Sequence, residues 1–255
     1  MEDSHFFITL PSNSSMGVYP ENTISNYITK LSRAVNLNGE WEVGLSEIQF
    51  EKSWFNVRKR ENWVYFRPSP RAAYLAGEIS TGYYPDVETL IEAIHQTLQK
   101  MDTGALQNVK LTFNKVSNRV GIEVSGDVTI AFSNDIAVVL GFESGFAPIS
   151  KTMTAPLTPN IQLGIYSLFV YCNIAQPQMV GDSQVPLLRI VPIEGRYGDY
   201  ITRSFQSPQY IPVSRKSFDS IEIDIKDDTG RNISFESGKS VVTLHFRLKR
   251  SPYFN

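Results

Sequence analysis

Short apolar runs separated by turn residues dominate both ends of the chain. The run Phe6–Leu10 ends at Pro11 and a Ser/Asn cluster, which is the signature of a strand followed by a loop. Near the other end, three isoleucines at 221, 223 and 225 alternate with charged residues, as in a strand with one buried face and one solvated face. Expected strands lie at 6–10, 24–31, 41–50, 63–66, 109–113, 120–124, 128–132, 165–174, 187–193, 200–204, 221–225, 232–235 and 241–248.

In the segment 41–50, the alternation of apolar and polar residues changes phase. Its apolar residues are first Trp41, Val43 and Leu45, and then the alternation moves by one residue. Such a shift predicts a β-bulge between Gly44 and Glu47. The preceding pair Asn38–Gly39 is the usual sequence of a type I′ turn and predicts a hairpin.

The middle of the chain has a different pattern. From 87 to 101 the apolar residues follow the spacing of one helical face, and Asp86 stands where an N-cap is expected. A second, short helix is expected at 135–140, capped by Ser133 and ended by Gly141. With the strands between them, these helices predict a small α+β domain.

Many short antiparallel strands around a helical block predict a mainly β protein, a single jelly-roll sandwich with an inserted small α+β domain. We place the first part of the jelly roll at 1–71, the insert at 72–155 and the second part at 156–255. We find no internal repeat and no linker-like stretch.

Composition then limits the function. Apolar residues make up 42% of the 255 residues, so the chain can bury a core, and a formal charge of −2 argues against a dedicated nucleic-acid or membrane-surface binder. Aromatic residues, at 12%, favour wide packed surfaces. The first residues do not resemble a secretory signal, no window reaches the length of a membrane-spanning helix, and one cysteine requires no oxidising compartment.

Catalytic residues are hard to find. His5, His95 and His245 lie far apart in sequence and lack metal-ligand spacing, and Cys172 sits in an apolar strand as a small buried residue. We therefore expect no enzyme activity, no metal and no cofactor.

Several segments, in order along nearly the whole chain, resemble the minor capsid (penton) protein of Polinton/Maverick elements, which are related to virophages and adintoviruses. The matching segments are 10–15 (LPSNSS), 19–23 (YPENT), 37–48 (LNGEWEVGLSEI), 82–85 (GYYP), 132–133 (FS), 140–142 (LGF) and 244–247 (LHFR). The most specific is 41–45, WEVGL.

The resemblance implies a structural protein that forms a homo-pentamer at the five-fold vertices of an icosahedral shell. Its implied partner is a double jelly-roll major capsid protein, with no specific nucleic acid and no membrane required. Its implied location is the virion, after synthesis in the host cytoplasm or nucleus. In virophage pentons a domain inserted between jelly-roll strands projects outward, which corresponds to the expected insert.

For the subunit interface we select Trp54, Phe55, Tyr253 and Phe254, because aromatic anchors are enriched in such contacts. An ordinary core position for Trp54 and a frayed tail for the last pair are the simpler interpretations. Two other functions are considered: a jelly-roll carbohydrate-binding module that stacks sugars on the aromatics of 54–66, and a cupin-type enzyme, which would need a histidine cluster.

Overall fold

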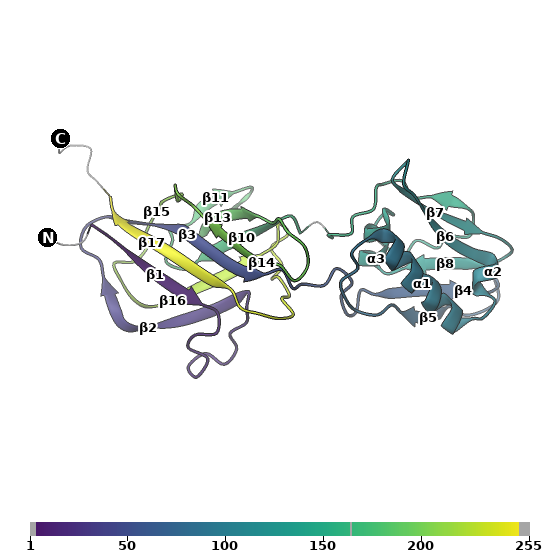
Figure 1. Cartoon of the computed structure of the whole chain (residues 1–255), viewed down its shortest axis with the longest axis horizontal. Coiled ribbons are helices and arrows are strands. Elements are labelled where there is room, and N and C mark those ends of the chain that lie inside the picture. The colour runs from purple at the N-terminus through teal and green to yellow at the C-terminus, as the bar shows by residue number, and fades with distance from the viewer. Residues whose placement is uncertain (1–3, 164, 250–255) are drawn as a thin grey trace. The chain divides into compact units, whose positions relative to one another are not determined.

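The computed structural model describes residues 4–163 and 165–249. Contacts within the chain divide it into two compact units, and Figure 1 shows its helices and strands. Unit 1 takes Met1–Trp54 and Ile165–Asn255, and unit 2 takes Phe55–Gly164.

Unit 1 is a sandwich of two antiparallel sheets. One sheet has the order β1-β17-β3-β14, with β15 also paired to β3, and the other has the order β13-β10-β16-β2. Its strands are β1 (His5–Pro11), β2 (Asn26–Asn36), β3 (Trp41–Glu51), β10 (Ser167–Cys172), β11 (Gln178–Val180), β12 (Ser183–Val185), β13 (Leu187–Pro192), β14 (Tyr200–Ser204), β15 (Ile211–Pro212), β16 (Ser217–Lys226) and β17 (Val241–Leu248).

The pairing of these strands is that of a jelly roll. β1 pairs with β17, β2 with β16, β3 with β14 and β10 with β13, so the first main strand meets the last and each later pair nests inside. Such nested pairs, rolled into two sheets, define the jelly-roll topology. The expectation of a mainly β jelly-roll fold is confirmed.

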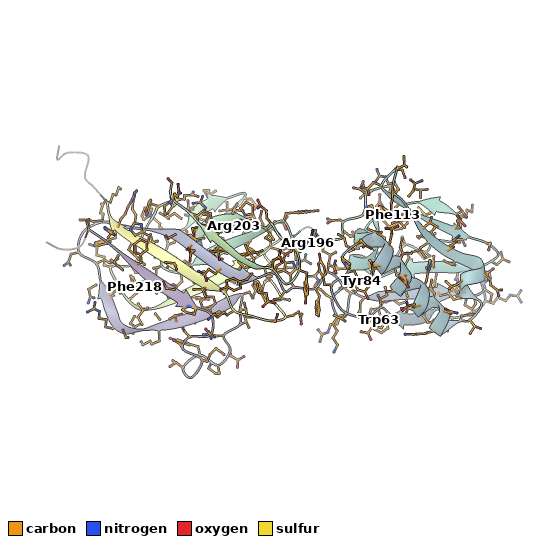
Figure 2. The ribbon with its side chains drawn as sticks, viewed as in Figure 1. Trp63, Tyr84, Phe113, Arg196, Arg203 and Phe218 are labelled. Carbon is orange, nitrogen blue, oxygen red and sulfur yellow. The ribbon has the colours of Figure 1, made fainter. Side chains whose placement is uncertain are left out.

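The core of unit 1 follows from strand alternation. Leu10, Val43, Ile223 and Phe246 have no exposed surface, because the inward-facing residues of both sheets meet between the layers. The ring of Phe246 stacks at 4.7 Å on Phe6. Across the layers it lies 5.9 Å from the ring of Phe218, which Figure 2 labels.

Unit 2 has its own core and elements of both kinds. Its two small sheets have the orders β5-β4-β8 and β6-β7-β9, and α1 contacts β4, β5 and β6 (Figure 1). The elements are β4 (Trp63–Arg67), β5 (Leu75–Glu78), α1 (Val87–Met101), α2 (Ala105–Asn108), β6 (Val109–Asn114), β7 (Arg119–Val124), β8 (Thr129–Phe132), α3 (Asn134–Leu140) and β9 (Met153–Thr154).

The boundaries of unit 2 differ from those expected for the insert. It starts at Phe55, well before 72, because β4 pairs with β5 and β8 of the same unit. It ends at 164, after 155, since Asn160 and Ile161 hydrogen-bond to unit 2. A change of composition near 72 does not reveal which strands pair, so it does not locate this boundary.

Several local predictions are confirmed, but the expected strand 232–235 is wrong, because this segment makes only isolated bridges at Asn232 and Phe235. The Asp86 carboxylate caps α1 by accepting the Thr89 N–H at 2.7 Å, and the bulge in β3 appears as a register shift against β17. The Asn38–Gly39 turn makes no hairpin, because β2 and β3 belong to different sheets. Ser133 and Gly141 bound α3 as expected, although the Ser133 hydroxyl donates to the Glu61 carbonyl and makes no capping hydrogen bond.

Candidate assembly surface

Two open sides of the sandwich in unit 1 are the candidate functional surfaces. Strands β1 and β2 are sheet edges that border the first side, and β13 and β14 are edges that border the second. Unpaired edge strands offer backbone donors and acceptors to another chain, and proteins usually cover or disrupt them. Both sides are therefore surfaces that assembly could use.

The first side contains a groove of about 590 Å³ between the two edge strands, which we call the β1–β2 groove. Its lining comes from residues 6–8 of β1 and residues 31–36 of β2. The pairing of β2 with β16 runs from Lys30 directly to Val35, so the four residues between them oppose a single residue and bulge from the sheet. Arg33, within this bulge, is exposed and has no acidic partner among the described residues.

Phe7 is the most prominent apolar residue beside the groove. Alternation in β1 turns Phe6 and Ile8 toward the core and leaves Phe7 on the opposite face, where it is 56% exposed. Its ring stacks on the imidazole of His245 at a centroid distance of 4.3 Å. A large exposed ring held in one place by a neighbour is suited to a protein contact.

His245 links Phe7 to a polar network. The Tyr210 hydroxyl lies 2.7 Å from its Nδ1, and the Arg247 guanidinium lies 3.5 Å from the Tyr210 ring centre. The ring of His5 is 5.4 Å away. Burial, followed by the neighbouring His5 and Arg247, lowers the pKa of His245, so the neutral imidazole is favoured here.

The lack of a side chain at Gly44 allows Tyr210 to reach this position. Gly44 lies opposite His245 in the pairing of β3 with β17. A Cβ atom at Gly44 would come within 2.9 Å of both the Gln209 carbonyl oxygen and the Pro208 side chain. The absence of a side chain therefore lets this segment close over the sheet and brings Tyr210 to His245.

The second side has different residues. Tyr200 on β14 is 56% exposed, and its hydroxyl donates to the Gln49 side chain at 3.0 Å. The Arg189 guanidinium lies 3.8 Å from the Phe205 ring centre. Arg203, labelled in Figure 2, pairs with Glu194 at 2.7 Å. The two sides thus present unlike surfaces, as a repeated head-to-tail contact requires.

The residues selected from the sequence lie elsewhere. Trp54 is only 4% exposed and packs edge to face on Phe235 at 5.5 Å, as a core residue of unit 1. Phe55 is half-buried at the start of unit 2. Tyr253 and Phe254 lie outside the described residues. A role of these four residues in a subunit interface stays a prediction. The sequence signal for Phe7 is the alternation in β1, which places its side chain on the face opposite the core residues.

His95 and Cys172 occupy partly or fully buried positions in the described chain. His95 in unit 2 accepts the Leu111 N–H at 3.0 Å, and burial raises the pKa of the Cys172 thiol to about 12. Among residues 4–163 and 165–249, no three His, Cys, Asp or Glu side chains gather in a group that could hold a metal ion. Over the same ranges, no helix is both long enough and apolar enough to span a bilayer.

The aromatic residues of 54–66 do not form one sugar-stacking platform on the sandwich. Trp54 is buried in unit 1, whereas Trp63 and Tyr65 belong to β4 of unit 2. The sandwich of unit 1 therefore lacks the aromatic platform expected for a jelly-roll carbohydrate module, whereas Tyr65 is partly exposed in unit 2.

Comparison with known proteins finds similarity of fold. No family model matches the sequence, and no curated protein matches it. Among solved structures, the fold is similar to that of the selenomethionine-labelled mavirus penton protein, with a TM-score of 0.50 and 13% sequence identity. The match covers 95% of this chain and 99% of that one. It extends over the jelly roll and unit 2 together.

Proposed function

We propose that the chain is a penton-type capsid protein that assembles into a closed ring of five subunits at the vertices of an icosahedral shell. The observation that carries the proposal is the likeness to a penton fold over 95% of this chain, combined with two unlike open sides on one jelly roll. A ring needs such a pair of complementary but different surfaces on each subunit. The protein's role in this proposal is structural, and its location is the virion.

In the proposed ring, the β1–β2 side of each subunit contacts the β13–β14 side of the next. Phe7 and the apolar lining of the β1–β2 groove would bury against Tyr200 and its surroundings. Arg33 has no acidic partner among the described residues and would approach Glu194, whose side chain is exposed. Phe55, Tyr253 and Phe254 remain candidate contacts of the same assembly, and Trp54 would support it from the core.

The finer identification rests on the sequence segments that resemble Polinton/Maverick minor capsid proteins. It adds a double jelly-roll major capsid protein as the partner that surrounds the pentamer. In this view unit 2 is the inserted module, continuous in sequence between β3 and β10 of the jelly roll.

Cysteine cross-linking tests the proposed contact directly. Cys172 is the chain's one cysteine and is buried, so introduced thiols can be labelled selectively. We suggest Ser32→Cys on the first side and Thr202→Cys, an exposed position of β14, on the second, joined by a flexible bismaleimide. The double variant should give a ladder that stops at five subunits, whereas each single variant should stay uncross-linked.

The single variants are the internal control. A contact between identical sides would place two copies of one thiol together and would give dimers from a single variant. Dimers from Ser32→Cys or Thr202→Cys alone would contradict the head-to-tail ring, as would a double variant that yields no ladder at concentrations where the chain is assembled.

A further inference from the structure

Unit 2 carries a cluster of aromatic side chains around one arginine, which we call the Phe146 platform: Tyr65, Arg67, Tyr74 and Phe146. Strand β4 supplies the first two, because Val64 and Phe66 point into the core and leave Tyr65 and Arg67 on the other face. Tyr74 comes from the segment just before β5, and Phe146 from the segment after α3. Residues distant in sequence thus converge at one surface.

Phe146 is the centre of the platform. Its ring lies 5.3 Å from that of Tyr65 and 5.4 Å from that of Tyr74, edge to face in both pairs. Although it touches two rings, Phe146 is still 52% exposed. Among the described residues, neither tyrosine hydroxyl has a hydrogen-bond partner within the protein, so both are open to a ligand.

Arg67 gives the platform a charge. Its guanidinium lies 5.0 Å from the Tyr74 ring centre, and one terminal nitrogen donates to the Thr129 hydroxyl at 3.1 Å. In the described part of the chain, Arg67 has no carboxylate partner, and its buried Nε has no acceptor. The guanidinium is therefore held in place but its charge is not neutralised, which favours an anionic ligand and disfavours a cationic one.

We propose that the Phe146 platform binds an acidic saccharide. The apolar C–H face of the sugar ring would lie on Phe146, the sugar carboxylate would face Arg67, and the tyrosine hydroxyls would meet the sugar hydroxyls. A nucleic-acid base needs only one exposed aromatic face to stack, so an oligothymidylate is the competing probe in the test. The inference does not depend on the capsid proposal.

The test uses the full chain and titration calorimetry with four probes: trigalacturonic acid, 3′-sialyllactose and the carboxyl methyl ester of each. Esterification removes the charge and keeps the sugar. We expect binding of at least one acid that is ten-fold or more tighter than that of its ester. Phe146→Ala should weaken this binding at least ten-fold, and Arg67→Gln should lower affinity for the acid to that for the ester.

Two controls keep the result interpretable. Val116→Ala removes a side chain that is 99% exposed elsewhere in unit 2 and should leave binding unchanged. Arg67→Lys keeps the charge and should retain part of the preference for the acid, and circular dichroism checks the fold of each variant. Equal affinity for acid and ester, no binding of either acid by the intact chain, or tighter binding of an oligothymidylate probe would overturn the proposal.

Discussion

Replacement of Phe7 by alanine is the mutation that probes the proposed ring most sharply. An aromatic side chain offers about 200 Å² of surface, so an exposure of 56% leaves roughly 110 Å² for a partner to cover. At about 25 cal/mol per Å², that burial contributes up to about 2.8 kcal/mol for each contact. This corresponds to a change of roughly 100-fold in the dissociation constant.

Because alanine keeps a little of this area, we expect Phe7→Ala to weaken each subunit contact between roughly 10-fold and 100-fold. The subunit itself should stay folded, since the lost ring contacts are those at the surface, including His245. Sedimentation velocity over a concentration series measures the shift in assembly midpoint. Met179→Ala, an exposed apolar truncation on the β11–β12 hairpin, is the matched control. A Phe7→Ala midpoint within three-fold of the unmodified chain would refute the reasoning.

Three further predictions concern the subunit. Phe246→Ala removes a fully buried ring and should lower the free energy of unfolding of unit 1 by about 3–5 kcal/mol, measured by urea denaturation. Asn56→Ala removes two buried hydrogen bonds with the Tyr84 backbone and a part-buried one with the Ile161 carbonyl. It should lower the free energy of unfolding by about 3 kcal/mol, seen as faster hydrogen exchange in unit 2 with unit 1 unaffected. The His245 pKa is lower in the folded state, so its contribution to stability is present above about pH 6.5 and is lost as the pH falls through the folded pKa; His245→Gln should flatten the dependence of the urea midpoint on pH in this window.

Local sequence signals predicted local structure well. The periodicity after Asp86 places α1, and the change of phase after Leu45 places the bulge in β3, because each depends on neighbouring residues alone. The Asn38–Gly39 pair does not form a hairpin, because a hairpin depends on the strand partner as well as on the turn residues. Turn chemistry fixes how the chain reverses, but the partner of β2 is β16, far along the sequence, and packing of the whole sandwich decides that choice.

The candidate surface was harder to predict, because it depends on which strands become edges. Pairing of β1 with β17 brings His5 and Phe7 beside His245. The sequence does not reveal this cluster, because the two strands lie at opposite ends of the chain. Trp54 is a large aromatic residue beside an expected loop, yet its ring packs against those of Phe50 and Phe235. Aromatic residues are common in both cores and interfaces, and only the fold distinguishes the two positions.

Native mass spectrometry of the purified full chain tests the central claim most directly. One subunit has a mass of 28.8 kDa, so a closed ring of five has a mass of 5 × 28.8 = 144 kDa. We predict that the 144 kDa species dominates at high protein concentration and that Phe7→Ala shifts the population to the single subunit. A population that contains only monomers, or only dimers, at every concentration up to the solubility limit would contradict the proposed pentameric ring.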